Sequence, residues 1–363
     1  MNHRPYTVIL IVPTGIGAAI GGYAGDALPV ARAIASVADR LITHPNVLNG
    51  AQLYWPLPNA LYVEGYGLDK FAAKCWGLRP VHQNRVGLIL DQSIEPDLRL
   101  RQLQAADAAR ATLGLNLTDY VITDAPLQVQ LRSSASGSSW GTIDNPDSLL
   151  RAAEVLINKA EAEAIAVVVR FPDDIDSEAL QSYRHGQGVD PLAGAEAIIS
   201  HLIVRTFQIP CAHSPALSPL PLDPDLSPRS AAEELGYTFL PSVLVGLSRA
   251  PRFVVEACNF PSHNDIWADQ VDAVVVPATA CGSSALLSLS QLPVQIITVR
   301  ENQTQMQVLP EPLGIKAKQV NSYLEALGVL VAHKAGISPD TLSPNLPSLH
   351  CLSTTEISSP PNP

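Results

Sequence analysis

Short hydrophobic runs recur along the chain and alternate with segments in which apolar residues follow the spacing of a helix. The runs are five to seven residues long and lie at Val8–Val12, Val86–Leu90, Ala164–Arg170, Phe253–Ala257, Val271–Val276 and Val294–Val299. Their length and their β-branched residues predict strands that are buried on both faces. Helical spacing is found at Leu28–Arg40, Asp97–Leu113, Ser148–Ala162 and about Lys318–Leu327. This alternation predicts an α/β protein with mainly parallel sheets, flanking helices and Gly/Ser loops at the carboxyl ends of the strands.

The same pattern predicts the domain organisation. We expect an N-terminal α/β lobe over residues 1–125, a second α/β lobe over residues 126–337 packed closely on the first, and a Pro/Ser-rich tail over residues 338–363. The segment Tyr54–Leu68 holds two prolines and four aromatic residues, and we expect either a packed surface loop or a lid. Residues Ser133–Asn145 are expected to form a second Gly/Ser loop that binds a ligand, the alternative being a linker.

A glycine-rich loop follows the first predicted strand and contains Thr14, Gly15, Gly17, Gly21 and Gly22. Glycine takes positive φ freely, so the loop can curl until its N–H groups point at one spot that suits an anion. A β-α-β unit would set His44, at the end of the short strand Leu41–Thr43, beside this loop. The glycine spacing departs from the dinucleotide-binding pattern, and no Gly-Lys-Ser/Thr follows it. The loop predicts an anion site that faces His44; the alternative is that its glycines only allow close packing.

Acidic residues follow two further predicted strands. Asp91 comes directly after Val86–Leu90, and Asp124 comes after Tyr120–Thr123. Ligands of open parallel sheets bind at the carboxyl ends of the strands, so both carboxylates are candidate catalytic groups. Each of them could instead cap a turn or a helix.

The segment Tyr183–His201 gathers charged residues and glycines ahead of a predicted helix. Its candidate ligand-binding residues are Arg184, Gly188 and Asp190, and its candidate catalytic residue is His185. An arginine and a histidine before a glycine loop and a helix N-terminus can clamp a carboxylate or a phosphate. A solvated charged loop is the alternative.

A thiol stands where the predicted strand Val271–Val276 leads into a helix. The dipole of that helix can lower the pKa of Cys281, and the N–H groups that follow can hold an oxyanion. These groups belong to Gly282, Ser283 and Ser284. A nucleophilic thiolate needs a base, for which the sequence offers His44, His185 and His213. The alternative is a small buried residue that fills a tight turn.

Composition limits the classes of function. The 363-residue chain has a formal net charge of −11 and no Lys/Arg cluster, which argues against nucleic acid as a partner. Five cysteines without a CxxC pair fit a reducing compartment, and we expect the cytoplasm. The first hydrophobic run is too short to span a membrane, and Pro13 with the glycines after it does not fit a signal peptide. No HExxH or dense acidic motif predicts a metal, no cofactor is specified, and a homo-oligomer is left open.

Six segments together carry a likeness to a known family. They are PTGIGAAIGGYAGD, ITHPNVLNGAQLYWPLPNALYVEGYGLD, RHGQGVDPLAGAEAIISH, PCAHSPAL, ELGYTFLPSVLVGLSRAP and VVVPATACGSSAL. With them the chain resembles an uncharacterised domain-of-unknown-function family of cyanobacteria and plastids, over nearly everything before the tail. The resemblance implies a soluble protein of photosynthetic cells and supplies no activity, fold or catalytic residue.

These features predict a soluble enzyme that acts on a small anionic metabolite bearing a phosphate or a carboxylate. The Gly and Ser loops would hold the anion, and Cys281, a histidine and an aspartate would perform the chemistry. The sequence does not specify the type of reaction. The alternative is a non-catalytic metabolite sensor or assembly factor that presents the aromatic segment Tyr54–Tyr66 to a partner.

Overall fold

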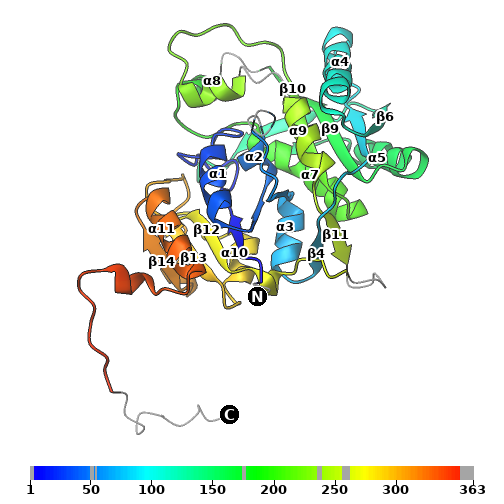
Figure 1. Cartoon of the computed structure of the whole chain (residues 1–363). Helices are drawn as coiled ribbons and strands as arrows, with labels where there is room; N and C mark the ends of the chain where they lie inside the picture. Colours follow the sequence, from blue (N-terminus) through cyan, green and yellow to red (C-terminus); the bar gives the residue numbers. More distant parts are fainter. Residues whose placement is uncertain are drawn as a thin grey trace, which may run out of the picture.

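The structure is a computed structural model that describes residues 4–49, 53, 55–173, 177–234, 239–255 and 262–351. Parts of three expected features lie outside the described residues: Tyr54 of the aromatic segment, residues 256–257 of an expected strand, and residues 352–363 of the tail. The described chain contains two parallel sheets with helices packed around them (Figure 1). The α/β fold class predicted from the hydrophobic pattern is confirmed.

Six parallel strands form the first sheet, and β1 lies in its interior. In spatial order the strands are β14 (Ala317–Val320), β13 (Gln295–Val299), β12 (Ala273–Pro277), β1 (Thr7–Leu10), β2 (Arg40–Thr43) and β3 (Ala60–Tyr62). The chain runs outward from β1 to β3 on one side and from β12 to β14 on the other. The connections after β1 and β12 therefore lead to opposite sides, and a crevice forms at the carboxyl ends of these two strands.

Four parallel strands form the second sheet, in the order β10 (Cys211–Ala216), β9 (Ala164–Arg170), β5 (Val86–Leu90) and β6 (Leu117–Ile122). Two antiparallel pairs stand apart from the parallel sheets: β4 (Trp76–Arg79) with β11 (Arg252–Val255), and β7 (Val129–Ser133) with β8 (Ser139–Ile143). The second Gly/Ser segment is thus largely a β-hairpin, because β8 and the turn before it occupy most of its residues.

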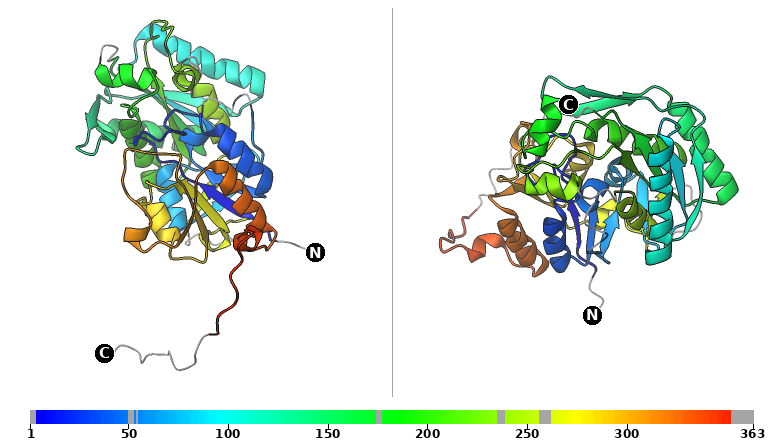
Figure 2. Two further views of the ribbon diagram at one scale, coloured as in Figure 1. Left: turned by 90° about the vertical axis from the view of Figure 1, so that its left-hand side faces the viewer. Right: turned by 90° about the horizontal axis from the view of Figure 1, so that it is seen from above.

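Helices connect the strands and cover the sheets, as the two further views in Figure 2 also show. Those that pack on the first sheet are α1 (Leu28–Val37), α3 (Gly65–Ala72), α10 (Ser284–Leu289) and α11 (Tyr323–Lys334). Those that pack on the second are α4 (Pro96–Leu113), α5 (Pro146–Ala160), α7 (Ala193–Phe207) and α9 (Phe239–Ser248). The shorter helices are α2 (Pro45–Leu48), α6 (Glu178–Arg184) and α8 (Pro228–Glu234). Single 3-10 turns lie at Ala268–Gln270, Glu311–Leu313 and Pro339–Leu342.

Alternate residues of the strands explain the helix layers, since successive side chains of a strand point to opposite faces. Val8 and Leu10 of β1 belong to a buried cluster with residues of α1 and α11, whereas Ile9 belongs to a cluster with residues of α3 and α10. In the second sheet, Val167 of β9 joins α5 and α7, and Val168 joins α9. Helix α9 shares its cluster with α1, so one continuous core connects the two sheets.

The two sheets draw on different parts of the chain. Strands of the first come from residues 7–62 and 273–320, and strands of the second from residues 86–216. The expected division into lobes at residue 125 stays a prediction, because strand pairing alone does not define folding units. Of the expected tail, residues 343–351 are exposed. No helix of the described part of the chain is long and apolar enough to cross a membrane.

Candidate functional site

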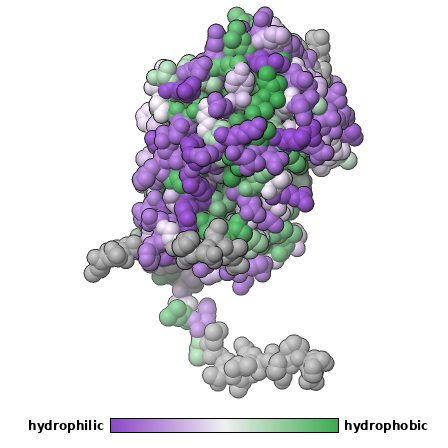
Figure 3. Space-filling model, turned by 90° about the vertical axis from the view of Figure 1, so that its right-hand side faces the viewer, coloured by the Kyte–Doolittle hydropathy of each residue, from purple (hydrophilic) through white to green (hydrophobic). Residues whose placement is uncertain are grey.

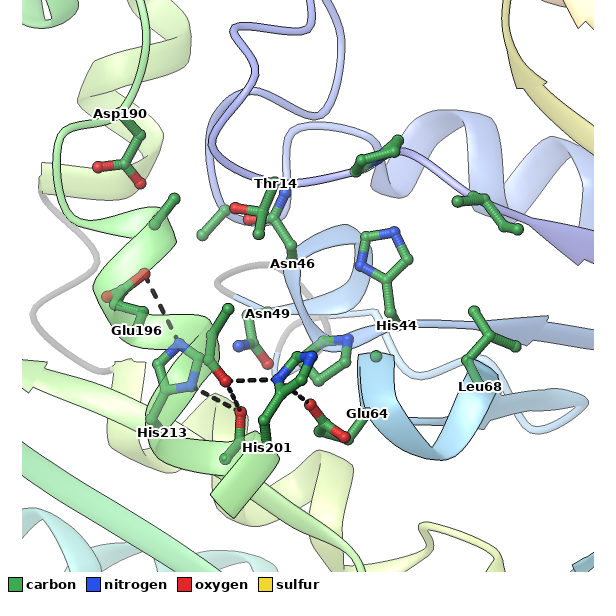
Figure 4. Close-up of a pocket in the computed structure, with 18 of the residues that line it drawn as sticks. Thr14, His44, Asn46, Asn49, Glu64, Leu68, Asp190, Glu196, His201 and His213 are labelled. Carbon is green, nitrogen blue, oxygen red and sulfur yellow. Dashed lines mark hydrogen bonds and ion pairs between the residues drawn. The ribbon is translucent and has the colours of Figure 1, made fainter. Parts of the chain in front are cut away.

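A cavity of about 330 Å³ lies at the carboxyl ends of β1, β2 and β3, opposite α7 and β10 (Figure 4). We call it the central cavity. Its ionisable side chains are His44, His201, His213, Glu64, Asp69, Asp190, Glu196 and Glu233. None of the described residues that line it is a lysine or an arginine. The central cavity is therefore a site of imidazoles and carboxyl groups without a permanent cation in its wall.

The first sheet supplies His44 and Glu64 to this cavity. His44 follows β2, and Glu64 lies two residues after the end of β3, a parallel neighbour of β2. Residues after the carboxyl ends of neighbouring parallel strands lie at one edge of the sheet, which brings both side chains to the cavity. The carboxylate of Glu64 accepts hydrogen bonds from the N–H of Tyr66 at 2.8 Å and of Gly67 at 3.2 Å. Glu64 thereby caps α3, and the cap fixes its carboxylate at the cavity wall.

Helix α7 forms the opposite wall. Ala193, Glu196, Ala197, Ser200 and His201 line the cavity. Their spacing of i, i+3, i+4, i+7 and i+8 places them on one face of the helix. The alanine side chains on this face are short, so the longer polar side chains beside them extend into the cavity.

Gly194 sets the position of α7 against the β7–β8 hairpin. A Cβ atom at this residue would lie 2.2 Å from the carbonyl oxygen of Ser139 and 2.3 Å from the Cα of Trp140. Both are backbone atoms, so a side chain could be accommodated only if the helix moved away from the strand. Glycine at this position therefore fixes where Glu196 and His201 stand.

His201 and Glu64 form the closest charged pair of the central cavity. The Nδ1 of His201 lies 2.7 Å from the Oε1 of Glu64 and also contacts the carbonyl oxygen of Ala197 at 2.5 Å. Burial opposes protonation of the ring, but the hydrogen bond to Glu64, its charge and the Ala197 carbonyl outweigh burial and raise the pKa of His201. The pair can hold a proton near neutral pH and release it to a ligand.

His213, on β10, belongs to a second polar array. Its Nε2 lies 3.6 Å from the Oε2 of Glu196, and its Nδ1 lies 3.3 Å from the Oγ of Ser200. Figure 4 shows the rings of His201 and His213 in the same pocket, with Glu196 beside the second. Each of the two imidazoles thus has a carboxylate of its own, a common means of orienting a histidine.

His44 is a neutral imidazole. Its Nε2 accepts a hydrogen bond from the N–H of Val12 at 3.1 Å, so the proton of the ring resides on Nδ1. Burial lowers the pKa of His44 to about 4. This bond joins His44 to Val12, at the end of the first predicted strand, and the ring offers a neutral N–H donor at physiological pH.

Two further carboxyl groups stand at the side of the central cavity nearest α8. Desolvation, followed by the charge of Glu196, raises the pKa of Asp190 to about 8. Desolvation and the charge of Asp190 raise the pKa of Glu233 well above its usual value. Tyr183 donates its hydroxyl hydrogen to the Oε2 of Glu233 at 2.6 Å. Burial therefore favours the protonated form of both groups, which lowers the negative charge of the cavity below what its composition implies.

The glycine-rich loop lies against other parts of the chain. A Cβ at Gly21 would lie 2.4 Å from the Cγ1 of Val12, and one at Gly22 would lie 2.4 Å from the carbonyl oxygen of Ala18. A Cβ at Gly15 would lie 2.8 Å from the Oγ of Ser139, and one at Gly17 would lie 2.8 Å from the carbonyl oxygen of Gly188. Thr14 lines the central cavity. Gly15, Gly17 and Gly21 also have positive φ, and Gly17 and Gly22 border a cavity together with Gly188. Close packing and backbone conformation both favour glycine in this loop, and anion binding by the loop stays a prediction.

Cys281 is fully buried beyond the wall of the central cavity. Its sulfur faces the carbonyl oxygen of Ala278 at 3.6 Å. Burial and the charge of Glu311 raise the pKa of the thiol to about 11, so at neutral pH it is not a thiolate. Among the residues after it, Ser283 lines the cavity and caps α10, Ser284 begins that helix, and Gly282 packs against Val308. The contacts of Cys281 favour the packing alternative.

The candidate aspartates at the second sheet make structural contacts. Asp91 is fully buried, and its Oδ1 accepts a hydrogen bond from the N–H of Leu127 at 3.0 Å. Asp124 pairs with Arg151 at 2.7 Å, and the hydrogen bonds from Arg151 and Ser148 hold the pKa of this carboxyl well below its usual range. Neither aspartate lines the central cavity. A catalytic role of these two residues stays a prediction with no support from their position.

Arg184 and His185 face a different region. Arg184 is buried, and its guanidinium lies 2.8 Å from Glu234 and 3.9 Å from Asp223. His185 lies 3.0 Å from the same Asp223. Gly188 and His185 line a separate cavity of about 580 Å³ beside Gly17. Of the candidates in this segment, Asp190 is the one that reaches the central cavity.

Glu64, Glu196 and His201 were not among the candidates, and His213 was weighed only as a base for Cys281. Glu196 and His201 lie on an apolar helix whose other cavity-facing residues are small, and this contrast is a usable signal. Glu64 lies within the aromatic segment, between a short strand and a helix start, where a glutamate can serve as N-cap. Among the described residues, no group of three or more His, Cys, Asp or Glu side chains is arranged to hold a metal ion.

Comparison with known proteins places the chain in a family. It is 62% identical over 344 residues to a protein of Synechococcus sp. named an uncharacterized lipoprotein, with 95% of each chain covered. No solved structure matches the chain. Residues 7–343 match the family described as "Protein of unknown function (DUF3326)". The resemblance seen in the sequence is confirmed: the chain belongs to the DUF3326 family.

Proposed function

We propose that the protein is an enzyme that transfers protons to and from a small polar metabolite in the central cavity. The observation that carries the proposal is that two imidazoles, each beside its own carboxylate, face one cavity together with a third imidazole that is neutral. A general acid or base works best when its pKa lies near the working pH, and a histidine next to a carboxylate meets this condition.

His201 with Glu64 is the principal acid–base group in this proposal. His213, beside Glu196, is the second and would serve the opposite face of the ligand. His44 would donate a hydrogen bond from Nδ1 without changing its protonation state, because its pKa is about 4. This division of roles gives the site one proton donor, one acceptor and one neutral positioning group.

The wall of the central cavity also bears on the class of substrate. The sequence led to the expectation of an anionic metabolite, but the described lining offers no lysine or arginine, and His201 is its main source of positive charge. Carboxylates and imidazoles favour a ligand that donates hydrogen bonds, such as one with hydroxyl or amino groups. We therefore propose a hydroxyl- or amino-bearing metabolite, with any acidic group of the substrate held beside His201.

Deuterium incorporation tests the proposal. Pools of polyols, amines and amino acids are incubated with the purified protein in D₂O and followed by proton NMR. We expect the protein to exchange or convert at least one compound, and His201→Gln to slow that reaction on the order of 10²-fold or more, the usual worth of a general acid or base. His82→Gln, at an exposed histidine remote from the cavity, is the matched control and should leave the rate unchanged.

The non-catalytic sensor makes a different prediction in the same samples. A sensor would bind a compound, visible as saturation transfer from protein to ligand, without exchanging or consuming it. His201→Gln would then alter affinity alone. Binding without any reaction in the unaltered protein would rule out the enzymatic proposal and leave the sensor.

We further propose that the folded chain works in a reducing compartment such as the cytoplasm. Cys75, Cys211 and Cys281 are free thiols, which supports this location. The Synechococcus relative is named a lipoprotein, which points to attachment of that protein to a membrane. A membrane-associated location is therefore the alternative for this chain.

A further inference from the structure

A second cavity, of about 590 Å³, lies beside the central cavity. We call it the apolar chamber. Its walls come from α4, α6, the start of α7, α8 and the proline-rich segment over residues 215–226. Seven leucines supply much of its apolar lining, and charged residues such as Arg101, Asp223 and Glu234 also border it. The leucines are Leu98, Leu180, Leu192, Leu217, Leu220, Leu222 and Leu226. A concave apolar space of this size is typical of sites that take the hydrocarbon part of a small ligand.

The apolar chamber and the central cavity share a wall. Asp190, Glu196, Pro215, Glu233 and Phe239 line both. These five residues face both the leucines of one space and the histidines of the other. Desolvation raises the pKa of both Asp190 and Glu233 and favours their uncharged forms, so the shared wall is less polar than two ionised carboxylates would make it.

The proline-rich segment is fastened over the apolar chamber near its start and near its middle. Near its middle, the buried guanidinium of Arg184 donates to the carbonyl oxygen of Pro221 at 2.7 Å. At its start, Ser218 donates its N–H to Asp173 at 3.0 Å. Leu222 is 94% exposed although it belongs to the chamber lining, which places an unpaired apolar side chain at the mouth. The polar contacts hold this segment in place, and its leucines line an apolar space that none of the described residues fills.

We propose that the apolar chamber holds the hydrocarbon chain of an amphipathic substrate whose polar head lies among the histidines of the central cavity. The inference rests on the proposed function and deepens it, because it names the substrate class of the same site. The hydrocarbon is a linear alkyl or an isoprenoid chain, and the head is a group that donates hydrogen bonds.

Displacement of a neutral fluorescent probe, N-phenyl-1-naphthylamine, from the full chain tests this inference. The competitors are linear alcohols from hexanol to hexadecanol, and geraniol and farnesol. We expect saturable binding in which the affinity of the linear alcohols rises roughly threefold to fourfold per methylene until the chamber is filled. Tighter binding of the linear series than of the terpene alcohols identifies an alkyl chain, and the reverse order identifies an isoprenoid.

Variants locate the binding. The double change Leu217→Gln and Leu220→Gln should weaken alcohol binding at least tenfold, as should Ala231→Phe, which fills the chamber from α8 without adding a polar group. Leu324→Gln is the matched control, since Leu324 is 80% exposed on α11 and remote from the chamber. No saturable binding, or equal affinity in every folded variant, overturns the inference.

His201→Gln separates this inference from the proposed function. The variant should still bind the probe and keep the same gain in affinity per methylene along the alcohol series, because the ring lines the central cavity and not the apolar chamber. Alcohol binding without any His201-dependent reaction would leave the chamber standing as a binding site and remove the enzyme. A His201-dependent reaction without alcohol binding would support the enzyme and rule out the apolar chamber as a binding site for hydrocarbon chains.

Discussion

Carboxyl groups of the chain itself occupy two helix N-termini at the central cavity. Glu64 accepts the first N–H groups of α3, and Asp190 accepts the N–H of Leu192 at 2.8 Å just before α7. Unpaired N–H groups at such positions attract anions, but here they already have partners. The sequence features that predicted a bound anion therefore also fit a protein that satisfies these groups with its own side chains.

The proton on Asp190 makes stability depend on pH. Its folded pKa of about 8 lies above the unfolded value, so between roughly pH 4 and pH 8 the unfolded state loses a proton that the folded state keeps. This destabilises the folded protein progressively as pH rises through that window. Asp190→Asn should remove the penalty and raise the free energy of unfolding at pH 8 by at least about 1 kcal/mol, the worth of one pKa unit. Urea denaturation from pH 4.5 to 8.5 measures it.

Asparagine keeps an oxygen for the N–H of Leu192, so the helix cap is retained and the comparison isolates the charge. Asp119→Asn, at an exposed carboxylate on β6, is the control and should change stability little at any pH. A gain at Asp190→Asn that is the same at pH 4.5 and pH 8.5 would contradict the assigned protonation.

For individual residues, the sequence predicted His44 and Asp190 as site residues. It did not predict the pairing of His201 with Glu64 or of His213 with Glu196. His201 meets Glu64 because α7, which packs on the second sheet, faces the carboxyl end of a strand in the first. A contact between distant segments has no local signal, since neither residue type nor spacing along the chain encodes it. The buried position of Cys281 was also not foreseeable, because a strand followed by a small-residue loop precedes reactive and packed thiols alike.

Among the elements, those with strong local patterns were predictable and those defined by tertiary contacts were not. The strand expected at Val86–Leu90 is β5, and the helix expected over Asp97–Leu113 is α4. The expectation of a helix near Lys318–Leu327 was wrong in its first half, because β14 is a half-buried edge strand without a long apolar run. Helix α3 was missed for the opposite reason: two glycines and a tyrosine at its start resemble a loop.

Gly194 is the residue on which the placement of α7 depends most. Gly194→Ala would press a methyl group onto the backbone of Ser139 and Trp140, and we expect it to lower the free energy of unfolding by about 1–3 kcal/mol, the usual cost of overpacking. It should also reduce any His201-dependent reaction, because α7 carries that histidine. Chemical denaturation and the NMR assay above measure the two effects.

Gly328→Ala is the matched control for this change. Gly328 lies inside α11, and a Cβ there would meet nothing within 4 Å. Alanine should be neutral or stabilise the protein by up to about 1 kcal/mol through its helix propensity. Equal effects of the two substitutions would mean that α7 can shift without cost.

In the whole molecule, one core joins two sheets. The face seen in Figure 3 is mostly hydrophilic, with hydrophobic patches between the polar residues. Helix α9 places Leu240, Val243, Leu244 and Leu247 in the buried cluster that also contains residues of β1, α1 and β9. The sheets are thus expected to lose their structure together when this helix is weakened.

Leu244→Ala tests the coupling. Leu244 is fully buried, and truncation of such a leucine typically costs about 2–5 kcal/mol. We expect a single unfolding transition at lower denaturant, with faster amide hydrogen exchange in β1 of the first sheet and β9 of the second. Leu100→Ala, at a leucine 54% exposed on α4, should leave both unchanged. Faster exchange confined to one sheet would show that the two sheets belong to independent folding units.

The interior place of β1 has a consequence for synthesis of the protein. β1 is made first, yet its neighbour β12 begins only at Ala273, so one edge of β1 stays open while most of the chain leaves the ribosome. The second sheet lies wholly between residues 86 and 216 and can form during this delay. An open, hydrophobic strand edge readily pairs with other chains. Ribosome stalling before Ala273 would therefore leave nascent chains prone to aggregate through the strand around which the first sheet is later completed.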